Sequence, residues 1–421
     1  MTRSPLTLAA AATSALPRVR VIAAGPLTAN GSGRCDAAVL NTDDERTLVV
    51  RAPVEATAAR ELATEALALR ALTPGVRALL GVRAPELLGE AGLGDVRALI
   101  TDFLPGYQVD AAHIPGGRGA ATSLGRALAS VHALPASVVR AEGLPVRSSD
   151  DIREELSAVL DRVDATDRTP HTLMARWRGA VASDSLWRFE STVTLGGASA
   201  TSFLFEDTDE GPTATGVLDW HGLSVGDPAI DLRWTASAPE AADDVFASYQ
   251  EASHRAPDAH LRSRARLYAE LEFAKWLVHG TEQHRADIVG DAVALLESLA
   301  DSVHDDDLVS GPLGEPLDDA MAILERVPPA SGSDVDTSMQ TDAYDPEELA
   351  QFFEDARDRG SEHGAAPEFS DTATSPIDLV AWADARTTAE PDDAHEADPA
   401  ADAAEADRAA REALRRWAAS E

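Results

Sequence analysis

The chain has 421 residues, of which 72 are acidic and 36 are basic, and its formal net charge at pH 7 is −36. This length predicts about two or three structural units, and the negative charge disfavours nucleic acid and anionic membranes as partners. The single cysteine, Cys35, excludes an internal disulfide and any metal site built from several thiolates. We therefore expect a globular, cytoplasmic protein.

The first residues, MTRSPLTLAAAATSALP, combine a basic residue with an alanine-rich run. A secretory signal has this order of features, but Pro5 interrupts the entry to the run and leucine is scarce in it. We favour an N-terminus that is not a signal. No stretch approaches the roughly 18 unbroken apolar residues of a membrane span, so we expect no membrane association.

The next residues carry strand and helix patterns in turn. Alternation of polar and β-branched residues predicts strands at residues 17–23, 36–41 and 47–52. The short polar link between the last two strands predicts an antiparallel hairpin. Residues 55–72 place apolar side chains three or four apart, which predicts an amphipathic helix. The apolar stretch VRALITDFLPGYQV then predicts a strand that ends at a break between two lobes, at Pro105.

Helical periodicity dominates beyond this break. It predicts helices at residues 120–133, 150–163, 171–187, 239–254 and 257–303, the last with breaks near Gly280 and Gly290. A β-rich region, TVTLGGASATSFLFE and ATGVLDW, lies between the third and fourth helices and is joined by the polar turn DTDEGPT. This order predicts an α+β fold with a small β-rich N-lobe at residues 1–104 and a larger helical C-lobe at residues 105–304.

The last part of the chain has a different composition. Residues 301–421 carry 32 of the 72 acidic residues and 8 of the 36 basic ones, which predicts an acidic, largely disordered tail at residues 305–421. Three segments in it have helical patterns: DPEELAQFFEDARDRG, SPIDLVAWADA and EADRAAREALRRWAAS. We favour a solubilising tail, and docking of these segments on a protein partner or on the chain itself stays open.

Six segments together carry a resemblance to a known family. They are TLVVRAP, ELATEALALRAL, LPGYQV, GVLDW, VGDPAIDLRW and RARLYAELEFAKWLVHG. Over about residues 4–300 the chain resembles the aminoglycoside phosphotransferase family of kinase-like small-molecule kinases, and within it the macrolide phosphotransferase-like branch. The resemblance implies a bilobal protein-kinase-like fold and transfer of a phosphoryl group from ATP or GTP, with Mg²⁺, to a hydroxyl of a small-molecule acceptor.

The resemblance also implies a cation on the third strand that holds the nucleotide phosphates. Lys275 is the only lysine and lies in a late helix, so this cation cannot be a lysine. Arg51 in VVRAP lies on the expected strand and resembles the arginine that this branch uses, with an outward-facing strand arginine as the alternative. Glu65 is expected to pair with Arg51, with Glu61 as the competitor, because an unpaired buried charge is costly.

Further nucleotide contacts follow from the same resemblance. Backbone groups at Thr101–Leu104, in particular those of Thr101 and Phe103, are expected to recognise the base. The glycines of ANGSGR are candidates for a loop over the phosphates, although such glycines are common in ordinary turns.

The second lobe departs from the family pattern at its catalytic loop. The pattern is H-G-D-x-x-x-x-N, and alignment on Gly196 places Leu195 at the histidine, Gly197 at the aspartate and Ser202 at the asparagine. Asp219 matches the magnesium-binding aspartate, with Ser202 as a weaker, neutral metal ligand. A glycine cannot accept the acceptor's proton, so a general-base contribution of roughly 100- to 10,000-fold is missing at this position.

Three other polar residues surround this pattern. Asp227 and Asp231 in GDPAIDL resemble the residues that anchor this segment to the helix after it, Asp231 by accepting backbone donors, and His221 is a weak candidate for a substitute base. We predict a pseudokinase-like family member with impaired catalysis and residual nucleotide binding. Two alternatives stay open: an active ATP- or GTP-dependent small-molecule O-phosphotransferase, and an interaction protein that acts through its tail.

Overall fold

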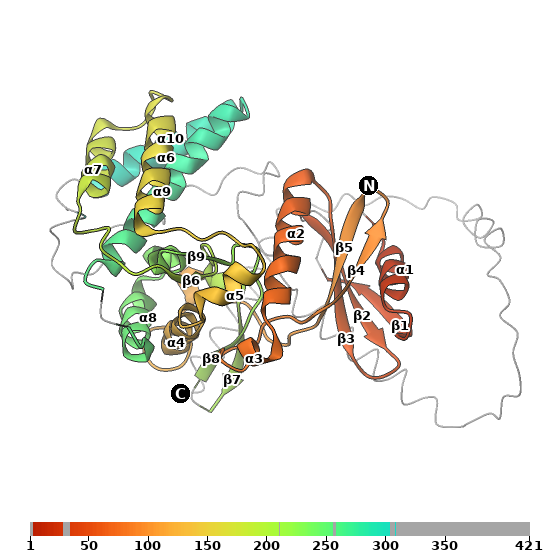
Figure 1. Ribbon diagram of the computed structural model, residues 1–421. Helices are drawn as coiled ribbons and strands as arrows, with labels where there is room; N and C mark the ends of the chain where they lie inside the picture. Colours follow the sequence, from red (N-terminus) through yellow and green to blue (C-terminus); the bar gives the residue numbers. More distant parts are fainter. Residues whose placement is uncertain (1–2, 28–33, 210, 256–257, 304–307, 309–421) are drawn as a thin grey trace, which may run out of the picture. The chain divides into compact units, whose positions relative to one another are not determined.

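The computed structural model describes residues 3–27, 34–209, 211–255, 258–303 and 308, all of which belong to the unit Met1–Glu362. The three helical segments expected in the tail lie outside the described residues, as do the glycines of ANGSGR. The described part has the predicted α+β composition, with a five-stranded sheet followed by a largely helical part (Figure 1). The predicted lobe boundaries remain predictions.

The N-lobe is built on an antiparallel sheet with the strand order β1-β2-β3-β5-β4. Its strands are β1 (Val21–Pro26), β2 (Cys35–Thr42), β3 (Thr47–Pro53), β4 (Leu87–Leu93) and β5 (Val96–Asp102). The predicted hairpin of β2 and β3 is confirmed. The first strand begins four residues later than predicted, and β4 was not predicted because two glycines interrupt its apolar pattern. Gly94, with a φ of 62°, supplies the left-handed turn between β4 and β5.

Helix α1 (Pro5–Ala15) covers one face of this sheet, and the sequence did not predict it. Ser4 caps the helix by accepting a hydrogen bond from the Thr7 amide, and Pro5 fits the first helical position because its missing N–H needs no partner there. The proline that we interpreted as an interruption therefore begins a helix. Leu8 is fully buried in a core shared with strand residues such as Val50.

Helix α2 (Ala56–Ala71) lies on the opposite side of the sheet from α1 (Figure 1). Side chains alternate between the two faces along β3, so Val50 points toward α1 while Val49 and Arg51 point the other way. The predicted amphipathic helix and the third strand thus place a charged side chain of each element on a shared face.

The helical lobe contains most of the predicted helices. Its helices are α4 (Ala120–His132), α5 (Ala136–Ala141), α6 (Ser149–Asp164), α7 (His171–Ala182), α8 (Pro239–Ala252), α9 (Leu261–Glu282) and α10 (Ala286–Ser302), with 3-10 turns η2 (Ala111–His113), η3 (Ala200–Ser202) and η4 (Pro228–Ser237). The short helix α3 (Pro74–Arg77) precedes β4 and belongs to the N-lobe part of the chain. The predicted helix 171–187 ends at Ala182. The predicted run 257–303 breaks at residues 283–285, and Gly290 lies inside α10. The predicted break near Gly280 is thus confirmed, and the one near Gly290 is wrong. Gly280 itself permits close packing, because a Cβ there would lie 2.6 Å from Ile288 Cγ2.

Two short sheets frame the central loop of this lobe. The predicted hairpin consists of β7 (Phe203–Thr208) and β8 (Gly211–Val217). The sequence did not predict that β6 (Thr192–Thr194) pairs with β9 (Ser224–Gly226), because each strand is only three residues long. The loop at residues 195–202 connects β6 to β7, so both of its ends are fixed by paired strands.

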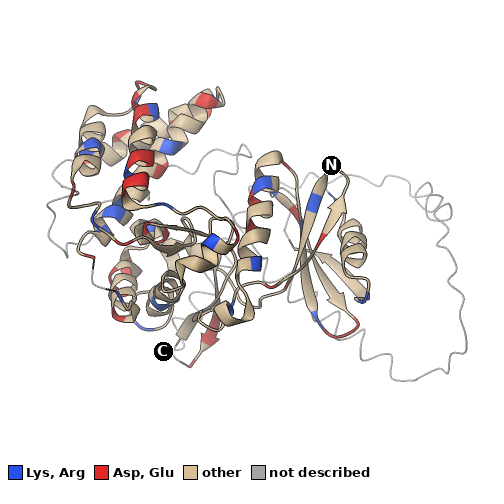
Figure 2. Cartoon of the chain, viewed as in Figure 1, with Lys and Arg blue, Asp and Glu red and all other residues tan. Residues whose placement is uncertain are grey.

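Figure 2 marks the positions of acidic and basic residues along the ribbon, and both kinds occur in both lobes of the described part of the chain. None of the described helices is long and apolar enough to cross a membrane.

Candidate functional site

Arg51 and Glu65 form an ion pair on the face of the sheet that α2 covers. Arg51 Nη2 lies 2.5 Å from Glu65 Oε1, and the two side chains are 18% and 4% exposed. Register places Arg51 opposite Ala37 and Leu99 in the middle of the sheet, which fixes its position along the strand. The competing Glu61 pairs with Arg34 at 2.6 Å instead. The sequence-predicted pair is therefore the one that forms.

The segment Thr101–Leu104 leaves the sheet between two apolar clusters. Phe103 packs against a cluster of N-lobe side chains, and Leu104 belongs to a second cluster. Their members are Leu27, Ala37, Val39 and Val49 for the first, and Leu104, Leu204 and Leu218 for the second. The Phe103 amide donates to Thr47 O at 3.1 Å, and burial raises the pKa of Asp102, whose carboxylate accepts from the Glu86 amide.

The loop at residues 195–202 has a fixed backbone although none of its side chains is charged. Asp231, which is fully buried, accepts hydrogen bonds from the amides of Leu195 at 2.6 Å, Gly197 at 2.6 Å and Ala198 at 3.2 Å. This is the role in accepting backbone donors that the sequence predicted for Asp231. A single carboxylate thus determines the path of the loop.

The anchoring carboxylate belongs to a buried chain that sequence reasoning missed. His132 Nε2 lies 3.1 Å from Asp231 Oδ2, and His132 Nδ1 lies 2.9 Å from the hydroxyl of Tyr249. Burial, followed by the charge of Asp231, raises the pKa of the Tyr249 hydroxyl, so that it stays protonated. A histidine on the apolar face of the helix 120–133 was the only signal in the sequence.

The first two positions of the loop are structural. Leu195 takes the place of the expected histidine and is buried in the main core. Gly196 has a φ of 76°, and a Cβ there would lie 2.3 Å from the carbonyl oxygen of Gly222. Since backbone cannot move aside cheaply, Gly196 is required for the close approach of the two segments.

Gly197 differs from Gly196 in what lies next to it. Its φ of 105° disfavours any side chain, and a Cβ at this position would lie 2.0 Å from Nη1 of Arg233. The guanidinium group of Arg233 therefore occupies the space that the Cβ of an aspartate at this position would fill.

Ser202 and Asp219 meet at the other end of the loop. The Ser202 hydroxyl donates to Asp219 Oδ2 at 2.5 Å, and the Leu218 amide donates to Ser202 O at 2.9 Å. The described residues contain no group of three or more His, Cys, Asp or Glu side chains that could hold a metal ion. Asp219 could bind Mg²⁺ as a single carboxylate ligand, so most other oxygen ligands would have to come from phosphates and water.

The remaining candidates have separate surroundings. Asp227 pairs with the buried Arg264 at 2.7 Å and also accepts from the Tyr268 hydroxyl and the Ala229 amide. It therefore anchors η4 to α9, whereas the sequence predicted an anchor to the next helix along the chain, α8. His221 makes no hydrogen bond or ion pair within the part of the chain that the structure describes. Its suggested role as a base stays a prediction.

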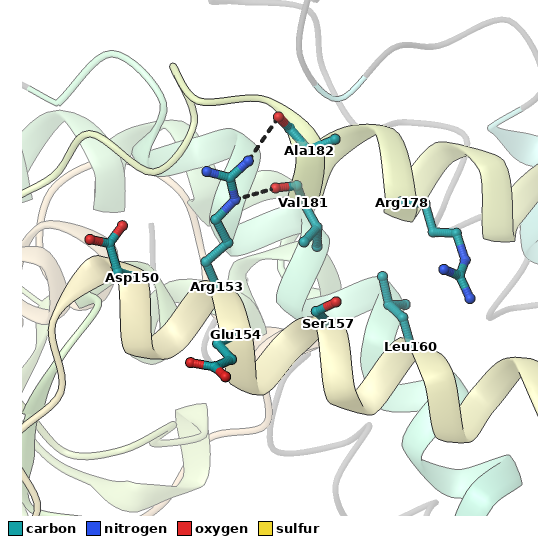
Figure 3. A pocket seen from close by; sticks show the side chains of 8 residues that line it. All are labelled: Asp150, Arg153, Glu154, Ser157, Leu160, Arg178, Val181 and Ala182. Atoms are coloured by element: carbon teal, nitrogen blue, oxygen red, sulfur yellow. Dashed lines mark hydrogen bonds between the residues drawn. The ribbon is translucent and has the colours of Figure 1, made fainter.

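A pocket of about 520 Å³ lies between α6 and α7 and contains none of these residues (Figure 3). Its central cation, Arg153, donates to the carbonyl oxygens of Val181 at 2.6 Å and Ala182 at 2.9 Å. The guanidinium group thus donates to the last carbonyl groups of α7, which have no partner within the helix. We therefore interpret Arg153 as a structural residue and not as part of a binding site.

Comparisons with known proteins agree with this arrangement. The model of the phosphotransferase enzyme family matches residues 26–268. The macrolide 2'-phosphotransferase MphH from Brachybacterium faecium, solved as the apoenzyme, has 24% sequence identity and a TM-score of 0.57, over 69% of this chain and 97% of that one. A type I macrolide 2'-phosphotransferase has 21% identity and a TM-score of 0.54, over 70% and 98% of the two chains.

A third structure similar to this chain is the GDP and kanamycin complex of APH(2")-IIia, with 17% identity and a TM-score of 0.55 over 69% and 97% of the chains. At these identities the solved structures establish a shared fold. A search of curated proteins found none that matches.

Proposed function

We propose that this chain, which belongs to the phosphotransferase enzyme family, binds a nucleoside triphosphate and transfers its terminal phosphoryl group slowly or not at all. One observation carries the proposal: the Arg51–Glu65 pair is intact, while the anchored loop presents Gly197 where the family pattern has its base. The residues proposed to hold the phosphates thus follow the family pattern, whereas the position proposed to accept the proton does not.

Support for nucleotide binding comes from the N-lobe and the segment after it. The two apolar clusters beside Thr101–Leu104 offer surfaces for the faces of a planar base, and Arg51 offers a positive charge for the phosphates. Relatives of the same fold bind GDP, so we propose ATP or GTP as the ligand. Mg²⁺ would be held by Asp219 and by the phosphates themselves.

Support for impaired transfer comes from the loop. A positioned general base contributes roughly 100- to 10,000-fold, and no carboxylate or imidazole stands between Leu195 and Ser202. The side chain that fills the position of the base is the cationic Arg233, which cannot accept a proton. The Ser202 hydroxyl is also committed to Asp219.

An active small-molecule O-phosphotransferase is the second candidate, because Asp219 keeps its place at the end of β8. Phosphoryl transfer through a loose transition state depends more on positioning and charge neutralisation than on proton removal. Macrolide and aminoglycoside hydroxyl groups would then be the acceptors, as the similar structures suggest.

The test separates binding from transfer in the full-length protein. Calorimetric titration with ATP and with GTP, with and without Mg²⁺, measures binding, and Arg51→Met is the variant expected to weaken it. Phosphate transfer is followed with a panel of macrolides and aminoglycosides. We expect saturable binding that depends on Arg51 and no detectable product. Ready turnover of any acceptor would establish the second candidate instead.

A further inference from the structure

Arg233 lies directly against the loop position that lacks its acidic side chain. A Cβ built on Gly197 would lie 2.0 Å from Arg233 Nη1 and 2.9 Å from Cζ, so the guanidinium group covers the Cα of this glycine. Arg233 comes from η4, two residues after the carboxylate of Asp231 that anchors the same loop. The loop and the cation are therefore held by one element.

The guanidinium group of Arg233 is largely buried but has few partners. Its side chain is 12% exposed, and Nη1 donates to the carbonyl oxygen of Ile230 at 3.3 Å. The carboxylate of Glu272 is 3.9 Å from Nε, which is beyond hydrogen-bond distance. A guanidinium group has five N–H donors in a planar fork that matches carboxylate and phosphate oxygens. Most of this donor capacity is unused.

The nearest carboxylate is shared with another cation. Glu272 Oε1 lies 2.7 Å from Nζ of Lys275, the only lysine in the chain, and the Glu272 side chain is 38% exposed. Arg233, Glu272 and Lys275 together carry a net charge of +1, and the carboxylate of Asp231 also lies beside Gly197. Asp231 is already bonded to three backbone amides and to His132. The attraction for an anion therefore comes from the unused N–H donors of Arg233 and not from a general excess of positive charge.

From this geometry we infer that Arg233 binds a phosphate-type oxyanion at the catalytic-loop position, in competition with Glu272. Binding would replace the long contact between Arg233 and Glu272 with short charge-assisted hydrogen bonds. The oxyanion has two sources, the terminal phosphate of a nucleotide or an anionic group of a small molecule on the acceptor side. The first source rests on the proposed function, and the second does not.

The experiment measures anion affinity in the full-length protein by calorimetric titration. Pyrophosphate, ATP and ADP are titrated, with EDTA present, into the wild type, Arg233→Gln, Glu272→Gln and the control Arg262→Gln. The control removes a half-buried arginine that pairs with Asp243 and lies over the ring of Phe246. Each affinity is calculated for the concentration of folded protein. The folded fraction of each variant is measured by denaturation without ligand.

We expect Arg233→Gln to weaken binding by at least about 10-fold, since hydrogen bonds to charged groups contribute about 1.5–3 kcal/mol and 1.4 kcal/mol is tenfold. Glu272→Gln should strengthen binding because it removes the competing carboxylate, and Arg262→Gln should have no effect. A loss for ATP that ADP does not share assigns the oxyanion to the terminal phosphate. A loss for pyrophosphate with unchanged ATP and ADP affinities assigns it to an anion site outside the nucleotide, on the acceptor side.

Two results would overturn the inference: affinities that do not change in Arg233→Gln, or a wild type that binds none of the three anions. These results are distinct from a failure of the proposed function. ATP binding that is independent of Arg233 would leave the proposed function in place. Pyrophosphate binding that depends on Arg233, in a protein that binds no nucleotide, would leave only the present inference.

Discussion

Replacement of Gly197 by aspartate restores the residue of the family pattern and should still leave the protein inactive. The left-handed φ of 105° costs about 1 kcal/mol for a residue with a side chain. The guanidinium group of Arg233, 2.0 Å from the new Cβ, must also rotate away and lose its hydrogen bond to Ile230, which costs about 0.5–1.5 kcal/mol. A new ion pair with Arg233 returns up to about 1 kcal/mol.

The expected net effect of Gly197→Asp is a loss of about 1–2 kcal/mol in the free energy of unfolding, with no gain in turnover. Gly197→Ala should cost slightly more, because it has the same backbone cost without the ion pair. Gly179→Ala in α7, where no atom outside the neighbouring helix backbone lies within 4 Å of the new Cβ, is the matched control and should gain about 0.5–1 kcal/mol in the free energy of unfolding.

Urea denaturation measures the stabilities, and a coupled phosphotransfer assay measures turnover. Adding Ser202→Asn and Arg233→Ala to Gly197→Asp restores a metal ligand and clears the space for the carboxylate, so we expect turnover to appear only in the triple variant. The reasoning is refuted if Gly197→Asp alone is as stable as the wild type, or if it alone raises turnover by about 100-fold or more.

Three other variants test the remaining contacts. Glu65→Gln should destabilise the N-lobe by about 1–3 kcal/mol in denaturant and weaken nucleotide binding, because the carboxylate beside Arg51 is lost; unchanged values would mean that the pair is dispensable. Asp231→Asn should cost about 2–4 kcal/mol, because one acceptor oxygen is replaced by an amino group that faces backbone donors; a cost below about 1 kcal/mol in urea denaturation would contradict this anchor. Burial raises the pKa of Asp102, so its contribution to stability is complete below its ordinary value of 3.8 and is lost as the pH rises through the folded-state pKa. In thermal denaturation, the melting temperature of Asp102→Asn relative to that of the wild type should therefore be higher at about pH 7 than at about pH 3. A relative melting temperature that is higher at about pH 3 would be inconsistent with this shift.

The parts of the fold that the sequence predicted are those with strong periodicity. Residues 55–72 show a clear helical spacing, and the hairpin of β2 and β3 has strong alternation and a turn-rich link. Helix α1 was missed because its alanine-rich pattern resembles a leader segment, and its hydrophobic side depends on a sheet that lies later in the chain. Local patterns cannot predict that kind of packing.

The candidate site divides along the same lines. The Arg51–Glu65 pair and the anchoring role of Asp231 followed from motif positions, because each role depends on one residue in one element. The position of Arg233 against Gly197 could not be predicted, since it depends on the backbone path of a loop and on a side chain more than 30 residues away. The lack of an acidic side chain at position 197 was visible in the sequence, whereas the cation beside it was not.

The central claim is that nucleotide binding survives where phosphoryl transfer does not. Its most direct test is one titration and one single-turnover reaction on the same wild-type preparation, with ATP or GTP labelled in the terminal phosphate and saturating acceptor. The account predicts a saturable complex whose label stays on the nucleotide. Rapid transfer of the label to a macrolide or aminoglycoside, or no complex with either nucleotide, would contradict it.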